Sequence, residues 1–262
     1  MLSRFLRLTR PRVLVVCALP VVALLLVTLL TPLPFTVARP GLTADVLGEN
    51  RGTQVITITG APTQETTGQL RMTTIQATGP DTDVSFGDVV VGWFDPDEAV
   101  MPRDAVYPSG DDVREIERFN REQMRESQGA ATDAALDYLD LDPADVDVTL
   151  RLADVGGPSA GLLFSLGIVD KLDTRDLTGG RVIAGTGTIT SDGEVGAVGG
   201  VPLKTLGAAR DGATVFLVPR AECADAEDGL PDGVRLIPVE TLDGAVDALT
   251  ALETGQGTVP AC

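Results

Sequence analysis

Residues 154–172, DVGGPSAGLLFSLGIVDKL, join a turn rich in glycine and proline to an almost unbroken apolar run. Glycine and proline typically mark turns, and the run that follows is long enough for a buried helix. Ahead of the turn, residues 146–152 alternate between apolar and polar side chains, as a half-buried strand does. The stretch therefore predicts a strand, a tight turn and a buried helix, which is the opening of an α/β domain.

The pattern continues in the same style toward the C-terminus. Strands are predicted over 181–190, 213–219 and 234–239, helices over 202–211 and 241–252, and a turn at Asp192-Gly193. We therefore expect an α/β (α+β) fold, with a compact domain over 146–254 and a short tail over 255–262.

The preceding part of the chain is less regular. Its pattern predicts an irregular stalk over 32–52, strands over 54–59, 69–78 and 88–94, and a helix over 111–139, capped by Ser109 and divided at Gly129. The charges of this helix are most simply a solvated face, so we assign them no chemistry. Residues 32–145 are expected to form a smaller β/α segment.

Residues 13–31 contain no charged side chain. As a helix they would be roughly 28 Å long, which is about the thickness of a bilayer core. Four arginines lie in residues 1–12, and acidic residues outnumber basic ones after the run. The positive-inside rule predicts a cytoplasmic basic tail over 1–12, a single transmembrane helix over 13–31, and an extracytoplasmic remainder. A cleaved signal peptide is the alternative, but the apolar run exceeds the usual ~7–15 residues.

Three cysteines are far apart in the chain. Outside the cytoplasm, Cys223 and Cys262 either form one disulfide or remain two thiols, and the sequence favours neither. Cys17 lies in the apolar run. No CxxC pair is present, so a site with four cysteine ligands is excluded.

The chain has no histidine and only two lysines. This composition excludes a histidine-containing catalytic triad and histidine-ligated metals, and we expect neither a metal nor a cofactor. The formal net charge of −18, without a basic cluster beyond the first residues, argues against a nucleic-acid partner.

Ser159 is the candidate nucleophile, provided that a base is available. Lys171 lies beside Asp170 and Asp173, where it should stay charged. Lys204 lies in GGVPLKTLGAA, among apolar neighbours that can hold an amine neutral by desolvation. From the residues alone, a Ser159–Lys204 dyad and a helix-capping serine with a surface lysine remain equally open.

The turn also suits oxyanion binding. Gly156 and Gly157 leave backbone N–H groups unobstructed, Pro158 fits an early helix position, and Ala160 and Gly161 are small enough for a substrate backbone to approach.

Three motifs resemble the proteolytic domain of the Lon family of serine peptidases: GGPSAG (156–161), AGTGTIT (184–190) and GEVGAVGGVPLKTLGAARDGATVFLVP (193–219). The exterior segment, including VITITGAPTQETTGQLRMTTIQA (55–77), resembles the membrane-anchored, PDZ-containing Lon-like proteases of bacteria. This resemblance covers about residues 146–252 for the proteolytic domain. It implies that Ser159 is the catalytic serine, that Lys204 is the general base, and that Thr186 hydrogen-bonds near the lysine.

The chain departs from the family in two respects. Many Lon enzymes carry an acidic residue two positions before the Pro-Ser pair. In this chain that position is occupied by Gly156, and the nearest acidic residue is Asp154. No room remains for a PDZ module between the long helix and the first strand of the compact domain. Apart from these two departures, the sequence contains no GxxxxGK[ST] phosphate loop, so ATP-driven unfolding is not expected.

These features predict a membrane-anchored, ATP-independent Ser-Lys endopeptidase that cleaves peptides or exposed protein segments outside the cytoplasm. The ring of full-length Lon implies a possible homo-oligomer. Two alternatives remain. One is a catalytically silent Lon-fold envelope module that binds a partner. The other is an enzyme of the signal-peptidase type, whose serine would be expected nearer the membrane segment.

Overall fold

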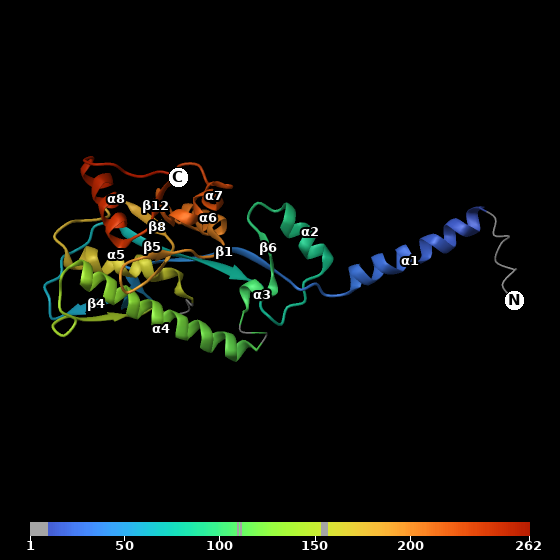
Figure 1. Ribbon diagram of the computed structural model, residues 1–262, viewed down its shortest axis with the longest axis horizontal. Coiled ribbons are helices and arrows are strands. Elements are labelled where there is room, and N and C mark those ends of the chain that lie inside the picture. The colour runs from blue at the N-terminus through green and yellow to red at the C-terminus, as the bar shows by residue number, and fades with distance from the viewer. Residues whose placement is uncertain (1–9, 109, 111, 153–156) are drawn as a thin grey trace.

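The computed structural model describes residues 10–108, 110, 112–152 and 157–262. Helix α1 (Arg10–Leu30) projects from one end of the molecule, and the remaining described elements surround a mixed sheet (Figure 1). The α/β class expected from the sequence is confirmed.

Six strands form the central sheet in the order β12-β11-β8-β5-β1-β6. Strands β12, β11, β8 and β5 run parallel, whereas β1 is antiparallel to both of its neighbours. These strands are β1 (Phe35–Asp45), β5 (Gln69–Ala77), β6 (Ala99–Pro102), β8 (Val182–Gly185), β11 (Val215–Pro219) and β12 (Arg235–Val239).

Short strands form three pairs outside this sheet: β2 with β3, β4 with β7, and β9 with β10. Their bounds are β2 (Glu49–Asn50), β3 (Thr53–Gln54), β4 (Ile56–Thr59), β7 (Asp147–Leu150), β9 (Thr188–Ile189) and β10 (Val195–Gly196).

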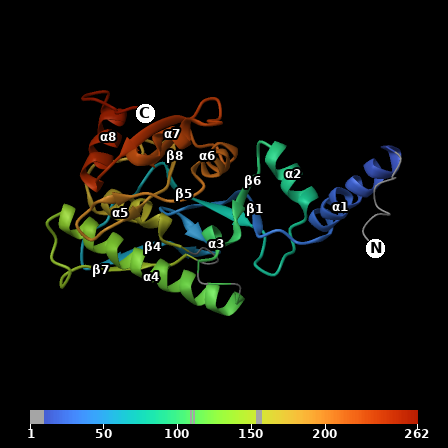
Figure 2. The same ribbon diagram turned by 45° about the vertical axis from the view of Figure 1, so that its right-hand side comes forward.

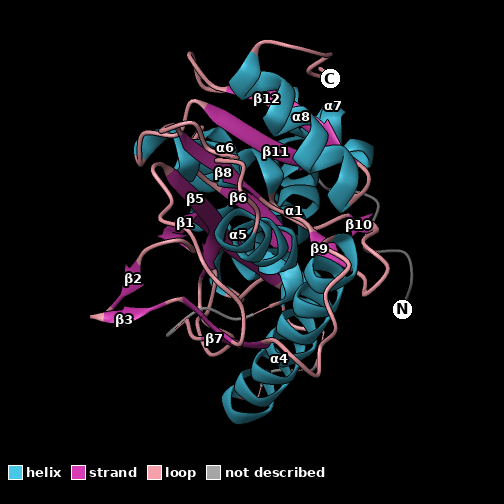
Figure 3. Ribbon diagram, turned by 90° about the vertical axis from the view of Figure 1, so that its left-hand side faces the viewer, coloured by secondary structure: helices cyan, strands magenta, loops and turns pink. Residues whose placement is uncertain are grey.

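Helices cover both faces of the sheet (Figure 3). Alternate residues of β11 point to opposite faces, so Leu217 packs in the cluster with α4, α5 and α8, and Phe216 packs in the cluster with α6 and α7. The helices are α2 (Phe86–Phe94), α3 (Arg103–Val106), α4 (Val113–Tyr138), α5 (Gly161–Leu172), α6 (Val201–Arg210), α7 (Cys223–Glu227) and α8 (Leu242–Thr254), with 3-10 turns η2 (Pro158–Ala160) and η3 (Arg220–Glu222).

The irregular stalk predicted over 32–52 is wrong, because β1 occupies an inner position of the sheet there. Pro40 and Gly41 interrupt the alternating pattern that would otherwise predict a strand here. The pairing register with β5 shifts between Pro40 and Thr43, which is how the strand accommodates them.

The strand predicted over 88–94 is also wrong, because these residues lie in α2. Ser85 caps this helix: its hydroxyl accepts from the Asp88 amide, and the Asp88 carboxylate accepts from the Ser85 amide. This reciprocal capping box outweighs the strand preference of the Val89–Val91 run.

Two further predictions need correction. Helix α4 runs unbroken through Gly129 and is capped by Asp112; Ser109, the predicted cap, lies outside the described residues. The strand predicted over 181–190 is divided at Thr186-Gly187, so that β8 belongs to the main sheet and β9 pairs with β10. The turn at Asp192-Gly193 is confirmed by a hydrogen bond from the Gly193 amide to the Thr190 carbonyl.

Apolar side chains of α1 from Val13 to Leu29 are exposed. Within the part of the chain that the structure describes, no helix combines the length and the apolar character needed to cross a membrane. At the other end of the chain, a disulfide joins Cys223 to Cys262, and Cys17 is a free, exposed cysteine.

Candidate active site

Ser159, the predicted nucleophile, lies in the 3-10 turn η2 that leads directly into α5. Pro158 opens this turn, and the next residue after the serine, Ala160, is buried while Ser159 itself is half-buried. A Cβ atom at Gly161 would come within 2.9 Å of Ile189 Cγ2. The small residues after the serine therefore allow α5 to start in close contact with β9.

Lys204 lies in α6, and its side chain is directed into the protein. The residue is only 4% exposed, and its Nζ donates a 3.0 Å hydrogen bond to the Thr186 hydroxyl. Burial lowers the pKa of the Lys204 amine from 10.5 to about 8, while the negative charge of Glu222 acts in the opposite direction. A substantial fraction of this lysine is therefore neutral near pH 8.

Thr186 connects the lysine to the serine turn. It follows the last residue of β8 and is fully buried. Its hydroxyl accepts the hydrogen bond from Lys204 and donates one of 3.4 Å to the carbonyl oxygen of Ser159, which also accepts a 3.0 Å bond from the Gly187 amide. The loop after β8 thus contacts both predicted catalytic residues.

The fold explains why residues far apart in sequence meet here. Helix α5 packs on one face of the sheet and α6 on the other. Their N-terminal parts approach each other past the carboxyl end of β8, where Thr186 lies. The carboxyl ends of parallel strands are where open α/β sheets place their sites.

Gly157 takes a backbone conformation that favours glycine. Its φ of 92° and ψ of 162° lie in a region almost closed to residues with a Cβ. The conformation directs the chain into η2 just before Ser159. Residues 153–156, which include Asp154 and Gly156, lie outside the described residues, so neither the acidic contribution nor the Gly156 amide is placed.

Helix α4 contacts the site, although its sequence pattern indicates only a solvated charged face. The Ser127 hydroxyl donates a 3.0 Å hydrogen bond to the carbonyl oxygen of Pro158. A cavity of about 190 Å³ adjoins this contact, and its lining comes from α4, Pro158 and β9. The lining residues are Gln123, Glu126, Ser127, Ala130, Pro158, Thr188 and Ile189.

Glu222 was also missed. It lies in η3, directly after β11, is 8% exposed, and accepts a 3.0 Å hydrogen bond from the Val198 amide. Burial raises the pKa of its carboxyl group, and Lys204 lowers it. Its position past the carboxyl end of a strand next to β8 was a usable signal in the sequence, because strand ends meet at one edge of the sheet.

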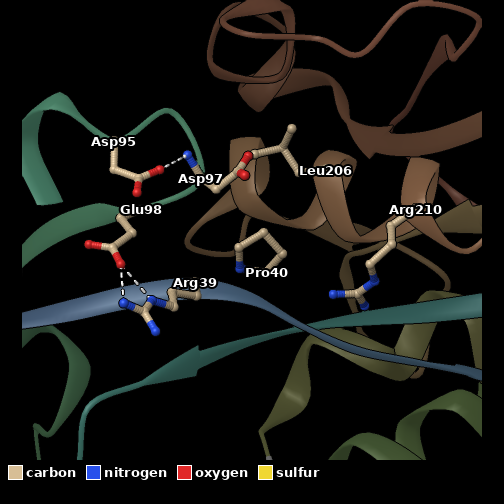
Figure 4. A pocket seen from close by; sticks show the side chains of 7 residues that line it. All are labelled: Arg39, Pro40, Asp95, Asp97, Glu98, Leu206 and Arg210. Atoms are coloured by element: carbon tan, nitrogen blue, oxygen red, sulfur yellow. Dashed lines mark hydrogen bonds and ion pairs between the residues drawn. The ribbon is translucent and has the colours of Figure 1, made fainter.

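A second cavity, of about 490 Å³, lies on the side of α6 opposite to Lys204 (Figure 4). Leu206 and Arg210 line it from one face of the helix, whereas Lys204, two residues before Leu206, points away from that face. Its other lining residues are Arg39, Pro40, Asp95, Asp97 and Glu98, among which Arg39 is paired with Glu98. None of the predicted site residues lines this cavity.

The structure therefore brings Lys204, Thr186 and the main chain of Ser159 together. The oxyanion-binding or supporting roles of Gly157, Pro158 and Ala160 stay predictions. Lys171, the other lysine, lies in the last turn of α5, as expected for a helix-end cation.

Comparison with known proteins identifies the same region. Residues 142–251 match the family profile of the Lon protease (S16) C-terminal proteolytic domain. The chain is 36% identical over 123 residues to a Lon protease of Clostridioides difficile (strain 630), covering 43% of this chain and 15% of that protein. It is 35% identical over 94 residues to a Lon protease of Mesomycoplasma hyopneumoniae (strain 232), covering 35% of this chain and 11% of that protein.

A third relative is Lon protease 1 of Bacillus subtilis (strain 168), 39% identical over 79 residues, which are 30% of this chain and 10% of that protein. The chain thus spans only a small part of the length of the curated relatives that it matches. The matched segment contains Ser159, Thr186 and Lys204, which are the residues that the fold assembles. Residues 142–251 of this chain are therefore a proteolytic domain of the Lon (S16) family of serine proteases.

Proposed function

We propose that this chain is a serine endopeptidase in which Ser159 is the nucleophile and Lys204 the general base. The observation that carries the proposal is the buried Lys204 amine, held by Thr186 beside the turn of Ser159. A buried amine with a pKa near 8 can accept a proton from a serine hydroxyl at moderately alkaline pH.

The hydrogen-bond directions support this role. Because the Thr186 hydroxyl donates its proton to the Ser159 carbonyl, it has to accept from Lys204. A neutral amine that spends one N–H on Thr186 keeps its lone pair for another donor. The Ser159 hydroxyl is the donor that the mechanism requires.

The proposed reaction has two halves. Ser159 Oγ attacks the scissile carbonyl carbon while its proton moves to Lys204 Nζ, and Lys204 then returns that proton to the leaving amine as the peptide bond breaks. In the second half, Lys204 takes a proton from water, whose oxygen attacks the acyl carbon, and the proton returns to Ser159 Oγ as the ester bond breaks. Backbone amides around Gly157 and Ala160 would hold the oxyanion in both halves.

We also propose that residues 13–31 anchor the chain in a membrane, with the basic tail cytoplasmic and residues 32–262 outside. The support is the uncharged run and the arginines ahead of it. The 262 residues contain no phosphate loop, so we propose cleavage of peptides or exposed protein segments without ATP. Assembly into a homo-oligomer is part of this proposal.

The test uses purified full-length chain, a fluorogenic unfolded polypeptide and a serine-directed covalent probe. We expect cleavage and labelling, both abolished by Ser159→Ala and by Lys204→Ala. Lys171→Ala is the matched control and should keep full activity, because Lys171 lies at the far end of α5. Full activity of Ser159→Ala would overturn the proposal. Wild-type chain that neither cleaves nor reacts would favour the non-catalytic interaction module.

A further inference from the structure

Helix α2 directs an apolar stripe away from the protein. Phe86, Val90, Trp93 and Phe94 are 39%, 38%, 73% and 82% exposed. Their spacing of i, i+4, i+7 and i+8 places them on one side of the helix. The opposite side carries Gly92, which is buried and where a Cβ would come within 3.2 Å of Val100 Cγ2 and 3.4 Å of Val37 Cγ1.

Backbone pairing fixes this helix beside the end of α1. The Leu33 amide donates a 2.8 Å hydrogen bond to the Val84 carbonyl, and the two residues form an antiparallel bridge. Leu33 lies three residues after the end of α1, and Val84 two residues before the start of α2. Figures 1 and 2 show the two helices at the same end of the molecule.

Through the pairing of Leu33 with Val84, the start of the stripe is therefore held close in space to the end of the uncharged run 13–31. A second contact supports this arrangement, since the Arg103 amide donates a 3.1 Å hydrogen bond to the Pro34 carbonyl. Through it, the segment after β6 also packs at the exit of α1. The level of α2 relative to the end of α1 is thus set by hydrogen bonds rather than by a free linker.

We propose that α2 is an interfacial helix whose stripe lies in the headgroup region of the bilayer in which residues 13–31 are proposed to be anchored. This inference rests on the anchoring part of the proposed function. Tryptophan and phenylalanine are favoured at the membrane surface, and a helix with one apolar side lies flat there. Asp88, the charged residue of α2, lies on the side away from the stripe. Anchored by α1 and α2 together, the catalytic domain keeps one face toward the lipid.

The proposal can be tested directly because Trp93 is the only tryptophan in the sequence. Full-length chain is reconstituted into phosphatidylcholine vesicles containing lipids brominated either near the headgroup or deep in the acyl chain. We expect Trp93 emission to move to shorter wavelength than in the unfolded chain. We also expect stronger quenching by the shallow bromines than by the deep ones.

Leu42 supplies the matched control. It is 74% exposed and lies about 30 Å along β1 from Leu33. A chain carrying Trp93→Phe and Leu42→Trp should fluoresce without bromine quenching. A second variant, Val90→Asp with Phe94→Asp, should restore long-wavelength emission of Trp93 and abolish its quenching while the chain stays in the vesicle fraction. These side chains are exposed, so the changes leave the core intact.

Three results would overturn the inference and separate it from the proposed function. In the first, the chain floats with the vesicles but Trp93 is quenched no more than the Leu42→Trp reporter. This result would refute the interfacial helix and would be consistent with the anchor. In the second, the chain does not float with the vesicles. This result would refute both the membrane anchor and the interfacial helix, and it would not affect the proposal of a Ser-Lys peptidase. Short-wavelength emission that lipid bromines do not quench, and that changes on dilution, assigns the stripe to a second copy of the chain.

Discussion

The Lys204 amine and the Thr186 hydroxyl form a 3.0 Å hydrogen bond inside the protein, and the same hydroxyl contacts the carbonyl of Ser159. Thr186 therefore links the predicted base to the turn of the predicted nucleophile, and we predict that it acts as a positioning residue. Its methyl group and backbone contribute to packing, whereas its hydroxyl carries the polar contacts.

The first prediction separates these two contributions of Thr186. Thr186→Val keeps the shape and removes the hydroxyl, leaving a buried amine without its partner at a cost of about 1–3 kcal/mol. We expect kcat to fall by roughly 10–100-fold, since 1.4 kcal/mol corresponds to tenfold. Thr186→Ser should retain most of the activity. Steady-state kinetics checks both variants, and a larger loss in Thr186→Ser than in Thr186→Val would show that the methyl group, not the hydroxyl, is what matters.

The second prediction concerns pH. Because the pKa of Lys204 is lowered to about 8, the neutral base is depleted below that pH, and activity should rise with pH and level off above about 8. Glu222→Gln removes the charge that raises the pKa of Lys204, so its rise should occur at lower pH. Profiles of kcat/KM against pH measure the shift. A midpoint unmoved or moved to higher pH contradicts the assigned coupling.

The third prediction is thermodynamic. The pKa of Lys204 is lower in the folded chain than its ordinary 10.5, so between about 8 and 10.5 the unfolded state binds more protons and stability rises with pH. Below pH 8 the buried lysine costs up to about 3 kcal/mol. Lys204→Met should therefore be inactive but more stable at pH 7. Denaturant unfolding at pH 7 and pH 9 checks this, and the variant should lose the corresponding part of the pH dependence.

The fourth prediction compares the same substitution at two glycines. Gly157→Ala should destabilise the turn of Ser159 by about 1–3 kcal/mol, because alanine avoids that backbone conformation, and activity should drop strongly. Gly129→Ala lies inside α4 with open space at its Cβ, and should stabilise by about 1 kcal/mol. Thermal unfolding and kinetics on both variants give the comparison. A Gly157→Ala protein of normal activity would mean that the conformation is dispensable.

The fifth prediction tests the contact from α4. Ser127→Ala removes the hydrogen bond to the Pro158 carbonyl and should lower stability by about 1 kcal/mol, with a several-fold fall in kcat. Thr132→Ala is the control on the same helix, since its hydroxyl donates to the Gln128 carbonyl of its own helix. Kinetics that rank the two variants equally would show that Ser127 has no special role in the site.

Sequence patterns were most informative where the chemistry is local. The Gly-Pro-Ser turn, the apolar run of α5 and the apolar surroundings of Lys204 are contiguous signals, and the structure confirms the turn, the helix and the burial. The contact of Ser127 with Pro158 joins residues 31 positions apart, and neither segment contains a sequence pattern that predicts it.

The errors have identifiable physical causes. Strand β1 was missed because Pro40 and Gly41 interrupt its alternation, and a register shift absorbs them. Helix α2 was read as a strand from its valines, although the Ser85–Asp88 capping box was visible in the sequence. The pairing of Cys223 with Cys262, which the sequence left open, depends on where α7 and the C-terminal tail lie in space, and composition does not encode that.

The order of the central sheet limits how the protein can be shortened. Strand β5 precedes the family-matched segment yet pairs directly with β8, and β1 pairs with β5 in turn. A fragment beginning at residue 142 would therefore expose the whole backbone edge of β8 and lose the serine contact from α4. Such a fragment would invite edge-to-edge association, so the unit that can be expressed and crystallised has to begin before β1.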